Sequence, residues 1–260
     1  MKRMRKGVFT ISLDFELYWG VRDHRSLRDY GENIKAVHQV TPALLDLFTK
    51  YNVHCSWATV GFLFHRNQAE LSGALPQGRP AYDKKEYDPY AYLQNNPLEE
   101  IYHFAPELIK RISETPGQEI GTHTYSHFYT LEKGAGTGAF KEDIGKAISV
   151  AAGKGYQLES IVFPRNQYGQ EHIRICREAG IKVYRGNENA SAYKPVSREE
   201  ERASRRAIRL LDAYINLTGH HCHPWPESGA IINVPASRFL RPYHPKLKMA
   251  DGLKRRRIIK

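Results

Sequence analysis

Short apolar runs rich in β-branched residues alternate along this sequence with longer amphipathic segments. Runs of strand length lie at residues 8–13, 53–61, 119–121, 161–163 and 181–184. Segments with apolar residues at helical spacing lie between them, at residues 34–51, 105–114, 139–154 and 171–179. A strand followed by a helix and another strand is typical of a parallel crossover unit. The sequence therefore predicts an α/β fold, either a parallel barrel or a doubly wound sheet, and it has no repeat typical of a solenoid.

The first predicted helix, residues 34–51, contains a proline. Thr41-Pro42 predicts either a kink or a fresh helix start, because proline cannot donate the helical hydrogen bond to the preceding turn. The apolar side chains that we expect to share the buried face are Val37, Val40, Leu44, Leu47 and Phe48.

Residues 66–97 interrupt the alternation. Their prolines and glycine are expected to prevent any regular helix. The tyrosines of this segment are Tyr82, Tyr87, Tyr90 and Tyr92. A loop of this length inside a domain is often a binding loop or a lid. A solvated linker fits the same composition, so the sequence leaves both interpretations open.

The length of 260 residues suits one large domain. We expect a single domain over residues 1–260, with a core at 7–185, the insertion loop at 66–97, and a C-terminal part at 186–260 in which the alternation weakens. Residues 247–260 resemble the start of a basic helix without a C-terminal cap. We therefore expect the chain to end before its fold is complete.

A net charge of +11 raises the question of a polyanionic partner. The basic clusters at residues 197–209 and 253–260 lack interleaved aromatic residues, so nucleic-acid binding is not favoured. Acidic residues follow the first apolar run too closely for a signal peptide, and no run approaches the length of a membrane span. Three cysteines suit reduced thiols. We expect a cytoplasmic protein, and the sequence fixes no oligomeric state.

Polar residues follow three of the predicted strands. Asp14 and Glu16 follow the first, His123 and His127 follow another, and Arg165 follows a third. Parallel α/β folds place reactive groups at the carboxyl ends of their strands, so these side chains are expected to converge.

Two imidazoles and one carboxylate form a ligand set suited to a catalytic metal. Asp14 and Glu16 can share a face because alternate residues of an extended segment point the same way. His123 and His127, four residues apart, would share a face if their segment turns helically. Together with Glu16 they match a zinc site that keeps one position open for water, and Asp14 would remain free to act as a base.

Three segments resemble the first three motifs of the polysaccharide deacetylase family, the NodB-homology carbohydrate esterases. These segments are Ser12–Glu16, Glu119–His127 and Arg165–Gly169, in the family's order and spacing. The likeness extends over about residues 7–185. It implies a distorted (β/α)7 barrel, here with its C-terminal strand and helix incomplete, that hydrolyses N- or O-acetyl groups on sugars. It also implies a divalent metal ion, with zinc expected and cobalt or nickel as alternatives.

The resemblance implies a role for each residue of the proposed ligand set. Asp14 matches the catalytic base, and His123 and His127 match the two metal-binding histidines. Phe15 occupies the place where the family usually has a metal-binding aspartate. Glu16 resembles the variant in which the acid follows one residue later, which makes it the third ligand.

Two further roles follow from the third motif. Arg165 matches the arginine that orients the catalytic aspartate. Tyr168 matches the residue whose backbone N–H helps to hold the oxyanion. Gln167 stands where the family usually has proline, so the geometry of this loop is open.

The group that protonates the leaving amine has no match. In the family it is a histidine of a late motif, which this sequence lacks, and Asp212 is a poor match to the family's fourth motif. Either the chain ends before that histidine or another proton donor replaces it. His220, His221, Cys222 and His223 could alternatively bind a metal ion of their own or be exposed loop residues.

Three functions remain open. The first is a metal-dependent deacetylase acting on an acetylated sugar, such as a nucleotide- or lipid-linked polysaccharide precursor in the cytoplasm. The second is a related barrel hydrolase that cleaves another non-peptide C–N bond, such as a cyclic amide. The third is a non-catalytic carbohydrate-binding protein that has lost the general acid.

Overall fold

A parallel sheet of six strands forms the centre of the molecule. The structure is a computed structural model, and it describes residues 7–226, 229–241 and 245–259. The strands lie side by side in chain order, and each neighbouring pair is parallel. They are β1 (Ser12–Phe15), β2 (Cys55–Thr59), β3 (Gln118–Thr122), β4 (Ser160–Ile161), β5 (Val183–Tyr184) and β6 (Ile232–Asn233).

The strand order distinguishes the two predicted architectures. A doubly wound sheet reverses its strand order at a switch point, whereas a β/α barrel adds each new strand beside the last. The order β1-β2-β3-β4-β5-β6 follows the second rule. The predicted α/β fold is confirmed, and its consecutive parallel strands are consistent with a distorted barrel.

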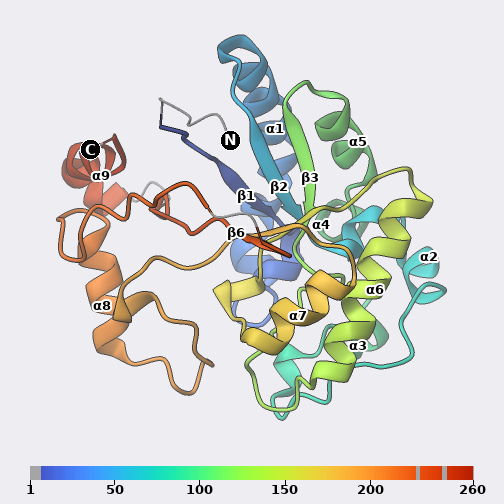
Figure 1. Cartoon of the computed structure of the whole chain (residues 1–260). Coiled ribbons are helices and arrows are strands. Elements are labelled where there is room, and N and C mark those ends of the chain that lie inside the picture. Colours follow the sequence, from blue (N-terminus) through green and yellow to red (C-terminus); the bar gives the residue numbers. More distant parts are fainter. Residues whose placement is uncertain (1–6, 227–228, 242–244, 260) are drawn as a thin grey trace.

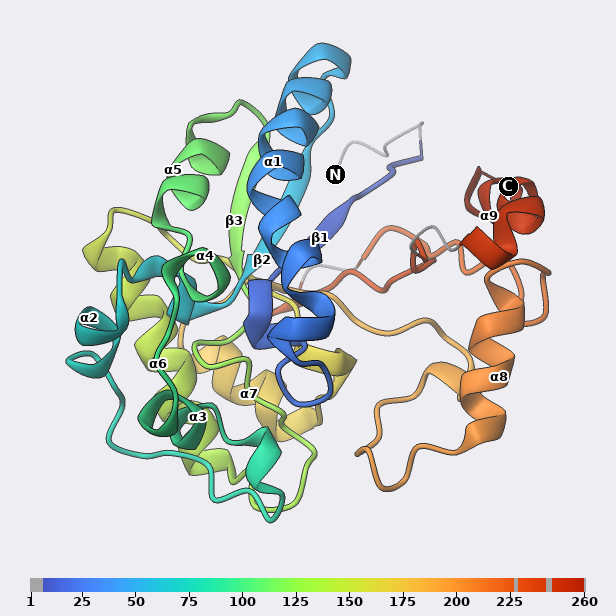
Figure 2. The same cartoon turned by 180° about the vertical axis from the view of Figure 1, so that it is seen from behind.

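Helices connect the strands and cover the sheet. In Figures 1 and 2, α1 and α5 flank β1 to β3, while α8 and α9 lie to one side of the main body. The α-helices are α1 (Leu27–Tyr51), α2 (Gln68–Ser72), α3 (Pro89–Asn95), α4 (Glu100–His103), α5 (Pro106–Glu114), α6 (Thr137–Gly153), α7 (Gln170–Glu178), α8 (Ala203–Asp212) and α9 (Asp251–Ile259). Short 3₁₀ helices lie at Leu17–Gly20, Gly61–Phe64, Lys85–Tyr87, Pro164–Asn166, Ser191–Tyr193 and Pro245–Ala250.

Helix α1 differs from its prediction in its start and in its buried face. It begins at Leu27, where the side chain of Ser26 accepts the Asp29 N–H as an N-cap, and it continues through Pro42 without a break. The buried residues include Thr41 and Leu45, spaced one turn apart. Of the five residues expected in the core, Val40 and Leu47 are exposed to 57% and 50%. The other three, Val37, Leu44 and Phe48, are partly buried and pack against the core as predicted. The apolar pattern missed Thr41, because its side chain is small and polar but occupies a buried position.

The segment 66–97 is packed against the core rather than solvated. The prediction that it contains no regular helix is wrong, because α2 and α3 lie within it. Pro89 occupies the first turn of α3, where the missing N–H costs nothing, and the Asp88 side chain accepts the next two backbone N–H groups. Its buried tyrosines are Tyr82, Tyr87 and Tyr90.

In the described ranges, no helix combines the length and the apolar composition that crossing a membrane requires.

The revised face of α1 gives a test of the fold. Leu45→Ala should destabilise the protein by about 2–5 kcal/mol, because it leaves a cavity at a position that is 2% exposed. Leu47→Ala, in the same helix, should change the stability by less than about 0.5 kcal/mol. Urea denaturation of the two variants measures both values, and equal losses would contradict the assigned face.

Candidate metal centre

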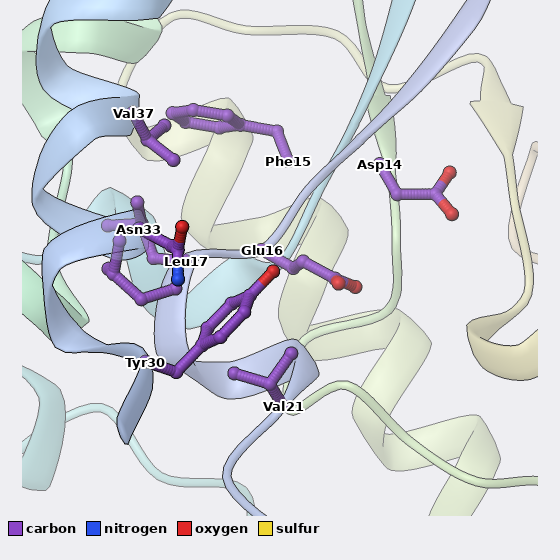
Figure 3. Close-up of a pocket in the computed structure, with 9 residues that line it drawn as sticks. Asp14, Phe15, Glu16, Leu17, Val21, Tyr30, Asn33 and Val37 are labelled. Atoms are coloured by element: carbon purple, nitrogen blue, oxygen red, sulfur yellow. The ribbon is translucent and has the colours of Figure 1, made fainter. Parts of the chain in front are cut away.

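Strand β1 presents two carboxylates on one side. Figure 3 shows Asp14 and Glu16 pointing to the same side of the strand, while Phe15 points to the opposite side, toward Val37 of α1. Phe15 is 4% exposed and packs edge-on against Trp57 of β2, with ring centroids 6.0 Å apart. Burial of this ring fixes the side to which its two acidic neighbours project. The pocket drawn in Figure 3 lies between β1 and α1, beside these residues.

The two histidines follow β3 in a turn rather than a helix. Thr124 and His127 have positive φ angles of 66° and 58°, a region that costs free energy for residues other than glycine. The hydroxyl of Thr124 accepts the Phe128 N–H at 2.7 Å and closes the turn. The carbonyl of Thr124 accepts the Gly61 N–H at 2.9 Å, which ties the turn to the loop after β2.

Asp143 of α6 holds the turn that carries the two histidines, residues 123–128, which we call the histidine turn. It is 1% exposed, and its carboxylate accepts the N–H groups of Tyr125 at 2.7 Å and Ser126 at 3.1 Å. The Ser126 hydroxyl donates to the same carboxylate at 2.5 Å. Burial raises the pKa of Asp143 to about 6, although these hydrogen bonds act in the opposite direction. One side chain of α6 thereby fixes Tyr125 and Ser126, which lie between the two histidines.

Glu16, His123 and His127 come together at the carboxyl ends of β1 and β3. Glu16 Oε2 lies 3.0 Å from His127 Nε2 and 3.3 Å from His123 Nε2. One ligand atom from each of the three residues lies within 4.8 Å of the other two. Both histidines are buried, whereas the Glu16 side chain is 28% exposed. The structure therefore brings together the predicted ligand set.

The protonation of these groups shows that a cation fits among them. His123 Nδ1 lies 2.8 Å from the carbonyl of Val162, which can only accept, so Nδ1 carries a proton. In the neutral ring, Nε2 of His123 is then unprotonated, and its lone pair is directed at the Glu16 carboxylate. Such an arrangement requires a second proton or a metal ion between the acceptor atoms. His127 Nδ1 is buried without a hydrogen-bond partner among the described residues.

The pKa values of the two histidines are shifted in opposite directions. Burial alone would raise the pKa of Glu16, but the hydrogen bonds from His123 and His127 prevail and hold it well below its ordinary value. Burial would lower the pKa of His123, but the charges of Asp14 and Glu16 raise it. Burial lowers the pKa of His127 despite Glu16. These shifts favour an ionised Glu16 and a positive charge on His123, whereas burial disfavours a positive charge on His127.

Arg185, at the end of β5, holds Asp14. Its Nη1 lies 3.0 Å from Asp14 Oδ1 and its Nη2 lies 3.3 Å from Oδ2, so both nitrogens contact the carboxylate. The same guanidinium donates to the Ser12 hydroxyl and to Asn166 Oδ1, each at 3.0 Å. These contacts fix the orientation of a side chain that is 31% exposed.

Arg165 contacts other acidic residues. Its guanidinium pairs with Asp23 and lies 3.3 Å from Glu132 Oε1. It also lies over the ring of Tyr129, 3.8 Å from the centroid. The structure thus does not bring Arg165 to Asp14, whose carboxylate pairs with Arg185.

Tyr168 and Gln167 follow β4 on the same edge of the sheet. The hydroxyl of Tyr168 accepts the Asn187 N–H at 3.0 Å. Gln167 is 3% exposed, and its side chain donates to Glu132 at 2.8 Å while its carbonyl accepts the Thr130 hydroxyl at 2.6 Å. In place of the expected proline, an amide side chain ties this loop to Glu132, which lies beyond the histidine turn in the chain.

The histidine-rich segment 220–223 is not gathered into a metal site. In the parts of the chain that the structure describes, Glu16, His123 and His127 form the only such group of three or more ligands. His221 Nε2 instead lies 2.7 Å from the Thr218 hydroxyl. Asp212 accepts the Thr218 N–H and pairs with Arg257, which gives it a structural place in the C-terminal part.

Sequence reasoning did not identify Arg185 or Asp143. Arg185 directly follows a predicted strand, so the rule that selected Arg165 could have selected it as well. Asp143 lies inside an amphipathic helix, and no local pattern distinguishes it from a solvated acid.

Comparison with known families supports the motif resemblance. A family model described as polysaccharide deacetylase matches residues 29–184. This range includes His123, His127 and Arg165. It begins after Glu16 and ends before Arg185, so the geometry of those positions rests on the structure alone.

Solved structures that match this chain include proteins from three bacteria. A Mycobacterium smegmatis protein assigned to the polysaccharide deacetylases is 14% identical with a TM-score of 0.55, over 96% of this chain and 70% of that chain. A de-N-acetylase from Aggregatibacter actinomycetemcomitans is 9% identical with a TM-score of 0.44, over 72% and 66%. A CE4 family pseudoenzyme from Bacillus anthracis is 12% identical with a TM-score of 0.38, over 67% and 42%. The chain spans less than two thirds of the latter two proteins, and a search of curated proteins found no match.

The support that Asp143 gives to the histidine turn can be tested by metal binding. Asp143→Ala should weaken zinc binding by about 10–100-fold although all three ligands remain, because the outer partners of a metal site orient its ligands. Glu142→Ala, an exposed neighbour in the same helix, serves as the control and should bind zinc as the wild type does. Competition with a chromogenic chelator measures both affinities, and wild-type affinity in Asp143→Ala would refute the role.

Proposed function

We propose that this protein is a metal-dependent hydrolase that removes acetyl groups from sugars. The chain belongs to the polysaccharide deacetylase family, because the family model covers more than half of its length. Its substrate would be an N- or O-acetylated sugar or polysaccharide precursor. Zinc is the proposed ion, with cobalt or nickel as alternatives, since two imidazoles and one carboxylate suit these metals.

The observation that carries this proposal is the position of Asp14 beside the three ligands. Glu16 would bind the ion while Asp14, two residues earlier on the same side of β1, stays outside the ligand group. A free carboxylate next to an ion is the arrangement that general-base hydrolysis requires. A purely structural site would be closed by a fourth protein ligand.

The metal ion and three residues have separate roles in the proposed hydrolysis. A divalent ion at such a site supplies Lewis-acid polarisation of the acetyl carbonyl and activation of a water molecule. Asp14 would take the proton of the attacking water, and its pair with Arg185 would keep the carboxylate oriented. The backbone N–H of Tyr168 is proposed to stabilise the oxyanion, as the family resemblance implies.

A nucleotide- or lipid-linked sugar in the cytoplasm is the substrate class that we propose. The second candidate is a carbohydrate-binding protein without catalytic activity. It is kept because the sequence has no match to the family's late histidine motif. The bidentate contact of Arg185 with Asp14 argues against that candidate, since a binding protein has no evident use for an oriented base beside a metal site.

Acetate release from defined substrates tests the function. The zinc-loaded protein is incubated with β-1,4- and β-1,6-linked N-acetylglucosamine oligomers and with an O-acetylated xylo-oligosaccharide. Acetate release that is lost in Glu16→Gln supports the deacetylase. Oligomer binding without acetate would instead favour the binding protein, and opening of a cyclic amide without acetate release would favour the related C–N hydrolase.

The proposed orientation of Asp14 predicts the effect of changing Arg185. Arg185→Ala should lower kcat by about 100-fold with little change in KM, because a misplaced base slows the chemical step. Arg185→Lys should fall between the wild type and Arg185→Ala, since lysine cannot contact both carboxylate oxygens in the same plane. Arg177→Ala, on the exposed side of α7, is the control. Wild-type kcat in Arg185→Ala with normal zinc content would exclude this role.

A further inference from the structure

The proposed reaction leaves one proton unassigned. When the C–N bond of an acetamido sugar breaks, the departing amine needs a proton, since an amide anion is a very poor leaving group. Asp14 faces the attacking water in the proposed mechanism, and the late histidine motif of the family is absent. A donor of this proton is needed only by a deacetylase, so its assignment rests on the proposed function.

His24 is an exposed imidazole on the loop that follows the metal-binding end of β1. The chain passes from Glu16 through the 3₁₀ helix Leu17–Gly20 into a turn that carries His24. Its side chain is 45% exposed, and its Nδ1 lies 2.9 Å from Asp23 Oδ1. A proton on Nδ1 that is donated to this carboxylate leaves Nε2 as the ring nitrogen that can exchange a proton with a ligand.

Asp23 is held firmly enough to orient that ring. Its side chain is 3% exposed, its Oδ2 pairs with Arg165, and its Oδ1 also accepts the Tyr129 hydroxyl at 3.2 Å. Burial would raise the pKa of Asp23, but the charges of Arg165 and His24 prevail and lower it. A buried, ionised carboxylate behind an exposed imidazole is the arrangement of a histidine that acts as an acid or a base.

A single aromatic side chain joins this pair to the metal centre. The Tyr129 hydroxyl contacts Asp23, and the Tyr129 ring lies edge-on to the ring of His127 with centroids 5.1 Å apart. The charges of Asp23 and His127 also interact directly. His65 and His103 are unsuited to this role, because they are only 2% and 0% exposed.

We propose that His24 donates the proton to the leaving amine and that Asp23 is its positioning residue. The hydroxide portion of water forms the new C–O bond, and the proton of that water passes to Asp14. The C–N bond breaks, its electron pair returns to nitrogen, and the proton on His24 Nε2 forms the new N–H bond. Acetic acid and a free amine leave, the acid loses its hydroxyl proton to solvent as acetate, and solvent returns the proton from Asp14 to His24.

A comparison of two leaving groups tests the assignment. An amine needs a proton in order to leave, whereas the phenolate of 4-methylumbelliferyl acetate does not. His24→Gln should therefore lower kcat/KM for an N-acetylglucosamine oligomer by about 100-fold or more, the usual contribution of a general acid. Its hydrolysis of the aryl acetate should fall far less, and its zinc content, measured by elemental analysis, should equal that of the wild type.

Two further variants separate catalysis from structure. His54→Gln changes an exposed histidine that precedes β2, at the opposite end of the sheet, and should retain both activities. His24→Ala should regain part of its amide hydrolysis when imidazole is added, because a small acid can enter the vacated space. A structural role for His24 would give no such rescue.

The contrary outcomes are distinct. Equal losses on the amide and the aryl acetate, unchanged amide hydrolysis in His24→Gln, or failure of imidazole to rescue His24→Ala would each overturn the assignment of His24 while the proposed deacetylase stands. A wild-type protein that binds zinc but hydrolyses neither substrate would overturn the proposed function, and the assignment of His24 with it.

Discussion

The site depends on a carboxylate that faces two buried imidazoles. Glu16 contacts Nε2 of both His123 and His127, and the carbonyl beyond His123 fixes that ring's other proton. In the neutral His123 ring, Nε2 and the Glu16 carboxylate are both acceptors, and two acceptors that face each other are stable only if a proton or a metal ion lies between them. The strained backbone of the histidine turn and the buried carboxylate of Asp143 are best understood as the structure that maintains this arrangement.

Around this centre the structure separates two carboxylate–arginine pairs. Arg185 holds Asp14, and Arg165 holds Asp23. A hydrolase that removes one proton from water and delivers another to an amine needs two groups that stay apart in this way, because direct exchange between them would be unproductive. Arg185 takes the place at Asp14 that the family resemblance implied for Arg165. Arg165 can therefore pair with Asp23 instead.

The sequence predicted where the strands end, but it did not predict which side chains from distant elements pair with one another. The apolar runs predicted the parallel sheet, and the motifs placed Glu16, His123 and His127 at its edge. Which arginine reaches Asp14 depends on the relative positions of β4 and β5, and local pattern carries no information about it. The buried face of α1 was predicted only in part for the same reason, since Thr41 is buried by its position and not by its apolarity.

The most direct test of the account is the metal content per chain, measured by elemental analysis on the wild type and on His127→Ala after identical zinc loading and dialysis. The account predicts about one equivalent of zinc in the wild type, as expected for one site of three ligands. It predicts a large loss of that zinc in the variant, with the fold retained by circular dichroism. A wild type without bound zinc, cobalt or nickel, or a variant that retains the full equivalent, would contradict the proposed metal centre.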